Sequence, residues 1–150
     1  MALKSDRYEL QTDISFFYNE AATTRGCLVG HGATAGTGAA MDQGAALCKK
    51  DKTAVPLGIL LNDVVDKDLT RTHLNQHKDE VQKGGKVTIL RKGYVVTNNV
   101  TNVADVDAGE VAYRCDDVDG NIASSGTVAV GRFLSAKDAD NYVKVEVNLP

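Results

Sequence analysis

Short apolar runs separated by polar turns dominate the last third of the chain. Apolar and polar residues alternate over 128–133 and again over 142–147, and the segment 135–141 between them is polar. A period of two buries one face of a strand, whereas Asp and Asn favour turns. The pattern therefore predicts two strands joined by an exposed turn.

Two stretches before them carry the same signal. The segment 84–98 predicts two short strands with a turn at 91–93 between them, where the sequence reads RKG. The segment 109–115 predicts another strand, and DDVDG at 116–120 predicts the hairpin turn that follows it.

The most apolar stretch of the chain, 54–65, predicts a buried strand over Leu57–Leu61. Pro56 has no backbone N–H to donate to a sheet, so we place it at the start or the edge of that strand. Gly58 inside the strand marks a bulge or a close approach of two backbones.

One segment, 66–83, is a candidate helix. It contains neither Gly nor Pro and ends before Gly84. Its apolar residues, Leu69, Leu74 and Val81, are sparse and form only a weak stripe. An irregular polar excursion that becomes ordered against a partner is therefore the alternative interpretation.

Two other segments stand apart in composition. The first twenty residues, 1–20, hold four of the eight aromatic residues, which predicts either an edge strand or an N-terminal arm packed on a neighbouring molecule. The glycine-rich segment 30–44 lacks the Gly-Lys-Ser/Thr sequence of a phosphate-binding loop and is interpreted as a flexible surface loop.

These segments together predict a mainly β protein of about eight short strands, arranged as a sandwich or barrel, with at most one short helix. At 150 residues the chain suits a single β domain over 21–150 preceded by the N-terminal segment 1–20. Within that domain, the glycine-rich loop 30–44 and the polar excursion 66–83 are the irregular parts.

Composition narrows the classes of partner. The formal net charge is −3 and no run of Lys or Arg is present, so we expect no nucleic-acid partner. No apolar run approaches a signal peptide or a membrane span, so we expect synthesis in a reducing cytoplasm and no membrane partner. The three cysteines, Cys27, Cys48 and Cys115, lack metal-ligand spacing and are expected to be reduced.

A search for catalytic and metal-binding residues finds no credible set. His73 and His77 have the spacing of a metal pair on one helix face, but further ligands are missing nearby, so we interpret them as solvated. The sequence lacks a nucleophile elbow, and its paired aspartates lie in turns. We therefore expect no enzyme activity, no metal, no cofactor and no small-molecule substrate.

The order of features from Leu57 to Val147 resembles the capsid decoration proteins, also called head stabilisation or cement proteins, of tailed bacteriophages. The resemblance covers about two thirds of the chain and is carried by VPLGILLNDVV at 55–65, GGKVTILRKGYVVTN at 84–98, GEVAYRCDDVDGNI at 109–122 and VGRFLSAKDADNYVKVEVNL at 130–149. These segments share a rhythm of strands and turn glycines and not a catalytic signature.

The resemblance implies a structural virion protein with a compact β-sandwich or barrel of the jelly-roll or tulip kind. It implies a homotrimer at threefold or quasi-threefold positions on the outer capsid surface, where it binds the major capsid protein and stabilises the expanded shell. From exposed aromatics and the sparse apolar positions of the excursion, we expect the partner contacts to include Tyr8, Phe16, Phe17, Tyr18, Leu69 and Leu74.

Two other classes of function stay open at this stage. One is a carbohydrate- or cell-surface-binding β-sandwich, although the absence of Trp weighs against a glycan platform. The other is a trimeric nucleotide-hydrolysing β-barrel of the deoxyuridine triphosphatase kind. The C-terminal sequence VKVEVNLP lacks the glycine-rich lid that such an enzyme needs.

Overall fold

The computed structural model of the chain describes residues 3–32, 46–66 and 74–150. In these ranges it is mainly β, as predicted, and its helical parts are two 3-10 turns, Gln76–Lys78 and Val103–Asp105. The strands are β1 (Tyr8–Tyr18), β2 (Leu28–His31), β3 (Leu47–Lys49), β4 (Pro56–Leu60), β5 (Asp63–Val65), β6 (Glu80–Gln82), β7 (Lys86–Thr97), β8 (Val111–Arg114), β9 (Ile122–Ala123), β10 (Ala129–Phe133) and β11 (Val143–Asn148).

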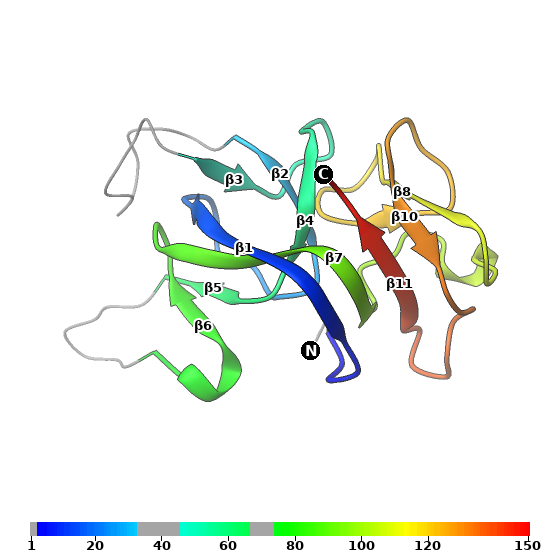
Figure 1. Ribbon diagram of the computed structural model, residues 1–150, viewed down its shortest axis with the longest axis horizontal. Coiled ribbons are helices and arrows are strands. Elements are labelled where there is room, and N and C mark those ends of the chain that lie inside the picture. Colours follow the sequence, from blue (N-terminus) through cyan, green and yellow to red (C-terminus); the bar gives the residue numbers. More distant parts are fainter. Residues whose placement is uncertain (1–2, 33–45, 67–73) are drawn as a thin grey trace.

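Five strands close into a ring at one end of the molecule, on the left in Figure 1. Their order is β1-β3-β2-β4-β7, and β1 pairs with β7 to complete the ring. Beside the ring, β5 and β6 form a separate parallel pair. The predicted sandwich or barrel is thus realised with a small closed ring as one half.

The other half is a sheet that grows out of the same long strand. From β7 the order continues as β11-β10-β8-β9, on the right in Figure 1. The antiparallel β10–β11 pair, with Phe133 opposite Val145, and the β8–β9 hairpin confirm the strands and turns predicted from 109 onward. β7 therefore belongs to both halves and joins them.

The two short strands predicted over 84–98 are instead one strand, β7, of 12 residues. The predicted turn at 91–93 is wrong, because one edge of β7 pairs first with β4 and then with β11 while β1 runs along the other edge. Gly93, at φ 140°, lies directly against the carbonyl oxygen of Tyr8, where a side chain would not fit. Gly93, which suggested a turn in the sequence, instead allows β1 to lie close to β7.

Two apolar cores lie on opposite faces of β2 and β4. Leu28 and Ile59 belong to the larger core under the second sheet, whereas Val29 and Leu57 fill the ring. All five residues of β4 are buried, which explains why 54–65 is the most apolar stretch of the chain. Pro56 starts β4 as predicted, and Gly58 packs against the backbone of Leu90.

The segment 66–83 is not a helix where the structure describes it. Residues 74–83 form a 3-10 turn followed by β6, which pairs in parallel with β5 and so takes its hydrogen bonds from another strand. Most of the predicted glycine-rich loop lies outside the described residues, as does Leu69. Gly30, placed in that loop, belongs to β2 and lies against Ala54 and Val55.

Candidate functional site

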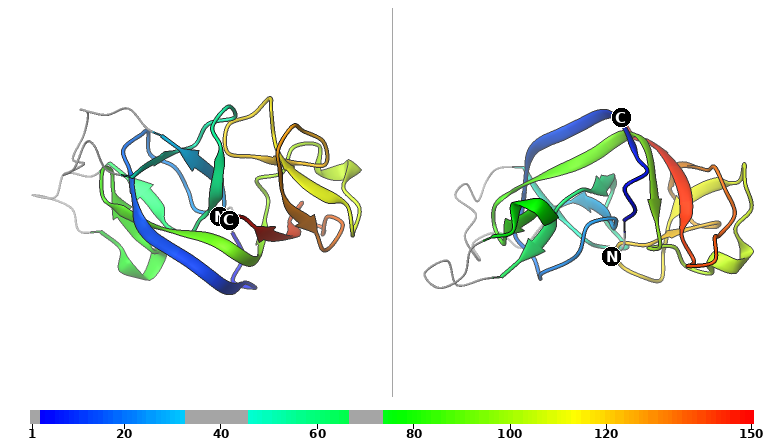
Figure 2. Two further views of the ribbon diagram at one scale, coloured as in Figure 1. Left: turned by 45° about the horizontal axis from the view of Figure 1, so that its top comes forward. Right: turned by 90° about the horizontal axis from the view of Figure 1, so that it is seen from below.

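β1 lies on the outside of the molecule and crosses over β7 (Figures 1 and 2). The chain before it is fixed, because Leu3 is buried in the larger core and the N–H of Lys4 donates to the carbonyl of Val96 over 2.9 Å. At its other end, Tyr18 is buried in the ring. The segment that carries most of the predicted partner contacts is thus an edge strand held at both ends.

The first half of β1 presents apolar side chains to solvent. Tyr8 is 54% exposed and its ring stacks on that of Tyr94, with the centroids 5.9 Å apart. Leu10 is 66% exposed, and together these three side chains line a hollow of about 190 Å³ whose floor includes Gly93. Charged and polar side chains from β7 and β11 also line this hollow, so its wall is only partly apolar.

Aromatic rings and cations continue from this hollow over the outer face of the second sheet. The Lys144 ammonium lies 4.0 Å from the centroid of the Tyr94 ring, and its Nζ is 3.6 Å from Asp6 Oδ2. The Lys4 ammonium lies 4.6 Å from the centroid of the Tyr142 ring. Both tyrosine rings are thus held in cation–π contacts with lysines of the same chain.

The second half of β1 brings the other predicted aromatics to the ring. Phe17 is half-buried under the Lys86 ammonium, and Phe16 meets His31 edge-on with the centroids 5.7 Å apart. Tyr18 is only 2% exposed, because its side chain packs into the ring core. Tyr18 is therefore inaccessible to a partner, whereas Phe16 and Phe17 are partly accessible.

The base of the excursion meets this end of β1. The N–H of Gly84 donates to the carbonyl of Tyr18, and the N–H of Tyr18 donates to the carbonyl of Gly85. Leu74 is half-buried. The structure thus brings Phe16 and Phe17 to the base of the excursion, whereas Tyr8 lies at the far end of β1, roughly 30 Å away along the strand.

Arg25 ties the excursion to the ring. Its Nη1 donates to the carbonyl of Lys78 over 3.2 Å and lies 3.0 Å from Asp79 Oδ2, and its backbone N–H donates to Asp63. The Arg25 side chain is only 13% exposed, so these charge-assisted bonds are partly shielded from water.

Replacing Arg25 with alanine is expected to lower the free energy of unfolding by about 1–3 kcal/mol, since a buried hydrogen-bonded charge is removed. Hydrogen exchange at β6 should accelerate more than exchange at β10, because the excursion loses its tie to the ring. Arg25→Lys keeps the charge but loses the planar donor. Its loss of unfolding free energy should therefore be smaller than that of Arg25→Ala. Equal acceleration in both strands would contradict a local role.

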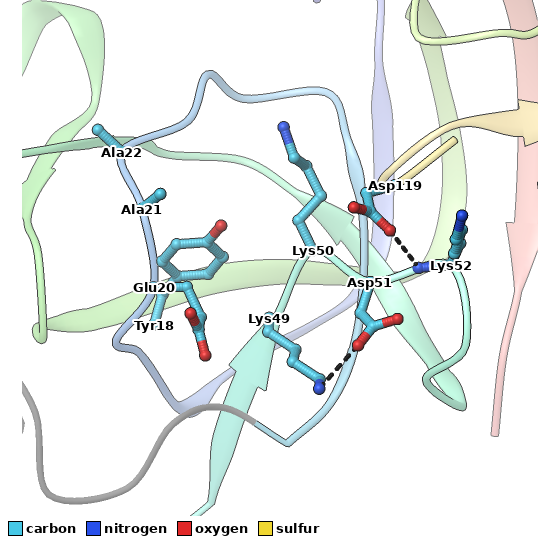
Figure 3. A pocket seen from close by; sticks show the side chains of 9 residues that line it. All are labelled: Tyr18, Glu20, Ala21, Ala22, Lys49, Lys50, Asp51, Lys52 and Asp119. Atoms are coloured by element: carbon cyan, nitrogen blue, oxygen red, sulfur yellow. Dashed lines mark hydrogen bonds and ion pairs between the residues drawn. The ribbon is translucent and has the colours of Figure 1, made fainter. Parts of the chain in front are cut away.

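A hollow of about 570 Å³ opens at the ring and is lined by three lysines and three acids (Figure 3). Lys49 Nζ lies 2.7 Å from Asp51 Oδ2, and the backbone N–H of Lys52 donates to Asp119. The hydrogen bond from Lys49 is the main cause that holds the pKa of Asp51 below its usual range. Lys49 and Asp51 thus hold each other in an ion pair, and the carboxylate of Asp119 is held by the backbone of Lys52.

Other chemistry is equally sparse in the described ranges. No group of three or more His, Cys, Asp or Glu residues is arranged to hold a metal there, and none of the described helices could cross a membrane. Burial raises the pKa of the Cys27 thiol to about 11 and that of Cys48 to about 12, so neither is a reactive thiolate.

A comparison with protein families agrees with this picture. The family described as structural cement protein (E217 gp24/Pam3 gp6) matches the chain over residues 4–148. The chain belongs to this phage cement family. None of the curated proteins compared with the chain matches it. The match spans nearly the whole chain, including the first strands, which carried none of the resemblance seen in the sequence.

As a member of this family, the cement protein is a structural component of the phage capsid and stabilises it. The resemblance to capsid decoration proteins is thereby confirmed. The candidate contact surface of the protein also includes Leu10, Ile14 and Tyr94, which were not among the partner contacts expected from the sequence. The signal for Tyr94 was its alternation with the buried Val95, once 84–98 is treated as one strand.

Acid is expected to weaken the ion pair that holds the N-terminal segment of this cement protein through Lys4 and Asp138. A hydrogen bond from Lys4 Nζ is the main cause that lowers the pKa of Asp138 from its ordinary value of 3.8. A lowered pKa stabilises the fold above the unfolded value, and this contribution is lost as the pH falls below it. The same bond raises the pKa of Lys4 above 10.5, so in alkali its contribution is lost as the pH rises past that value.

Asp138→Asn should therefore flatten the loss of stability between pH 5 and the acid limit, measured as the urea midpoint at each pH. Asp105→Asn, at an exposed aspartate of the second 3-10 turn, is the matched control for the removal of one surface carboxylate. An unaltered acid limb in Asp138→Asn would show that this ion pair contributes nothing to the pH dependence.

Proposed function

We propose that the protein binds the outer surface of the assembled capsid as a homotrimer at threefold or quasi-threefold positions and stabilises the expanded shell. The family supports a role in capsid stabilisation. A trimer requires a contact in which two different patches of the chain meet and the rotation closes into a ring. In this arrangement each copy contacts major capsid subunits and a neighbouring copy.

The observation that carries this proposal is the exposed apolar surface of β1. Seven large hydrophobic residues are exposed in the described part of the chain, and three of them, Tyr8, Leu10 and Ile14, lie on this one strand. Such a concentration marks a surface that is covered in the assembly. We assign partner contacts to Tyr8, Phe16 and Phe17, and to Leu69 and Leu74 of the excursion, and we omit the buried Tyr18.

Selective binding accounts for stabilisation. A protein that binds only the expanded shell stabilises that state by about 2.7 kcal/mol per site when its free concentration is a hundred times its dissociation constant. Many copies at symmetric positions then resist the pressure of packaged DNA. The role needs no catalysis, no small-molecule substrate and no cofactor.

The net charge of −3 supports an outward position, since an inward surface would face the like charge of DNA phosphates. The described cysteines, Cys27, Cys48 and Cys115, are free thiols, which agrees with synthesis in the reducing host cytoplasm. We propose that the protein is synthesised in the host cytoplasm and then binds the outer capsid surface.

Shells that lack the protein provide the test. Purified protein is added to expanded and to unexpanded shells, and the bound copies are counted and located by electron microscopy. We expect saturation at threefold positions of the expanded shell and a higher temperature of shell disruption. Binding to the unexpanded shell with equal affinity, or at other positions, would contradict the proposal.

Point variants map the contact better than truncation, because deleting residues 2–18 would also remove Leu3 and Tyr18 from the cores. Tyr8→Ala and Phe17→Ala should each lower shell occupancy at limiting protein about tenfold, if each loses roughly 1.4 kcal/mol of binding free energy. Val118→Ala, at an exposed residue of the β8–β9 turn, is the control and should bind as the unaltered protein does.

A further inference from the structure

Two exposed apolar side chains lie together at the far side of the second sheet. Val111 of β8 lies opposite Arg132 of β10, and Leu134 follows two residues after Arg132. Side chains two residues apart in a strand point to the same face, and the neighbouring Ala112 and Phe133 are buried on the opposite face. Val111 and Leu134, each 38% exposed, therefore share the outer face of this sheet.

Carboxylates flank these two side chains. The turn before β8 holds Asp107 and Glu110, both exposed, and the N–H of Asp107 donates to Glu110 Oε2 over 3.1 Å. The turn is fixed to the sheet, because a backbone N–H of β10 donates to the carbonyl of Glu110 over 2.8 Å. We call Val111, Leu134 and the two carboxylates the acidic patch. It lies within 74–150, a range that the structure describes without a gap.

The hollow beside β1 combines apolar side chains with a cation. Tyr8, Leu10 and Tyr94 supply the apolar part, and Lys92 of β7 lines the same hollow. Lys92 and Tyr94 are two residues apart on one strand, so their side chains point to the same face. We call these four residues the tyrosine patch. It lies on the outer face at the β7 side of the second sheet, whereas the acidic patch lies at the β8 side.

The other charges near the tyrosine patch are balanced within the chain. Two ion pairs lie beside it, Lys144–Asp6 at 3.6 Å and Arg7–Glu9 at 2.8 Å. Glu146 also lines the hollow, but it lies directly opposite Arg132 in the β10–β11 pair, so these two charges offset each other. Lys92 therefore leaves the tyrosine patch with an excess of positive charge.

The two patches complement each other. Each places exposed apolar side chains beside a charge, and that charge is positive in one patch and negative in the other. They do not overlap, because β11 lies between them. The remaining exposed large hydrophobics outside β1 in the described chain, Val55 and Val118, lie near the hydrogen-bonded Lys52 and Asp119. That site carries charges of both signs and so fits the tyrosine patch less well.

We propose that the acidic patch of each copy binds the tyrosine patch of the next, with Leu134 against Leu10 and the carboxylates beside Lys92. This contact rests on the homotrimer proposed above and names the two surfaces that build it. Because two different patches meet, the contact is heterologous, and three copies close it into a ring. Burial of the apolar side chains supplies the attraction, and the opposite charges set the orientation.

This contact divides β1 between two partners. The Tyr8 end meets the neighbouring copy, whereas the end with Phe16 and Phe17, roughly 30 Å away along the strand, stays available for the shell. Tyr8→Ala then lowers shell occupancy by weakening the trimer. A trimer binds the shell through three linked sites and therefore more tightly than a single copy does.

Cysteine pairs test which surfaces meet. Leu10→Cys and Leu134→Cys are made in separate chains, mixed in equal amounts and treated with a short bis-maleimide crosslinker. We expect a covalent dimer from the mixture and none from either variant alone, because two different patches meet. A single chain that carries both changes should give a covalent trimer and no larger product. The native thiols, Cys27, Cys48 and Cys115, are at most 3% exposed and should not react.

Val55→Cys replaces Leu10→Cys in the control mixture, because both positions are 66% exposed. Its linking to Leu134→Cys reports random collision. The mixtures are treated both in solution and on saturated expanded shells, so a trimer that forms only on the shell is also detected. Linking no faster than in the control mixture in both settings would overturn the contact. A product larger than a trimer from the chain with both changes would do the same.

Charge reversal tests the orientation. Lys92→Glu and Glu110→Lys should each weaken association of the copies about tenfold, and both changes in one chain should restore part of it. Lys50→Glu, at an exposed lysine of the ring outside both patches, is the control with the same change in net charge. Unchanged thermal unfolding would show that the variants are folded. Failure of the combined variant to recover would contradict the placement of Glu110 beside Lys92.

The function proposed above fails separately from this contact. If the protein saturates threefold positions of expanded shells but the test mixture links no faster than the control, the trimer uses other surfaces and capsid binding stands. If the linked trimer forms but does not bind expanded shells, the contact stands and the proposed binding to the expanded shell is wrong.

Discussion

Replacing Gly93 with alanine is expected to lower the free energy of unfolding by about 2–6 kcal/mol and to release the first half of β1 from β7. Two costs add at this position. Its φ of 140° is unfavourable for any residue with a Cβ, which costs about 1–3 kcal/mol. The new methyl group would also lie against the carbonyl oxygen of Tyr8, and overpacking of this kind costs about 1–3 kcal/mol.

Gly109 provides a matched control. It also has a positive φ, of 93°, but no atom lies within 4 Å of the place a Cβ would take. Gly109→Ala should therefore show the conformational cost alone. Urea unfolding measures the total, and hydrogen exchange of the amides at Leu10 and Thr12 reports whether β1 has separated from β7. Equal losses in both variants would show that the contact with Tyr8 is unimportant.

Separation of β1 would also affect binding. Tyr8 and Leu10 keep their side chains in Gly93→Ala, but they lose the strand that positions them beside Tyr94. Shell occupancy should therefore fall although no contact residue has changed. This result would show that the contact surface depends on the fixed strand and not on a flexible arm.

Replacing Phe133 with alanine is expected to lower the free energy of unfolding by about 3–5 kcal/mol, which is the usual cost of removing a buried phenyl ring and leaving a cavity. Phe133 is fully buried in the larger core, opposite Val145 of β11. The loss is a large part of the stability of a domain of this size, about 5–15 kcal/mol. Denaturant unfolding at pH 7 provides the measurement.

Phe17→Ala is the matched comparison, because it removes the same ring from a half-buried position on β1. Phe133→Ala should lose stability while its folded fraction still binds shells, since Phe133 faces inward. Phe17→Ala should show the reverse, with a smaller loss of stability and weaker shell binding. Weaker shell binding of folded Phe133→Ala would indicate that the second sheet transmits packing changes to the contact surface.

Much of the fold could be predicted from local pattern. The strands β8, β10 and β11 and the buried strand β4 follow from alternating or continuous apolar residues between turn signals. These signals are local because each side chain needs only to face one side of a sheet. The family resemblance came from this same rhythm of strands and turns, and the family comparison confirmed it.

The errors came from residues whose role is set by a distant strand. Gly93 predicts a turn when its neighbours alone are considered, yet in the fold it lets β1 pass close to β7. The residues of β6 predict a weak helix, but pairing with β5 outweighs that local preference. In both cases the competing partner lies many residues away along the chain.

The contact surface was predicted only in part, because the exposure of its residues also depends on strands far away along the chain. Aromatic composition drew attention to the first strand, and the structure places Tyr8, Phe16 and Phe17 at accessible or partly accessible positions. It also buries Tyr18 in the ring, which composition alone could not show. Which aromatic faces a partner depends on strand direction, bulges and the position of the core.

The sequence by itself determined that the chain builds a mainly β domain, that its strands alternate around apolar faces, and that it resembles capsid decoration proteins. Period-two alternation and turn residues act within a few positions, so they are legible in the sequence. Only the tertiary structure decided that five strands close into a ring, that β7 serves both halves, and that β1 is fixed at both ends. Those features depend on pairing between strands far apart in the chain, whose hydrogen bonds run between backbones that are alike in almost every residue.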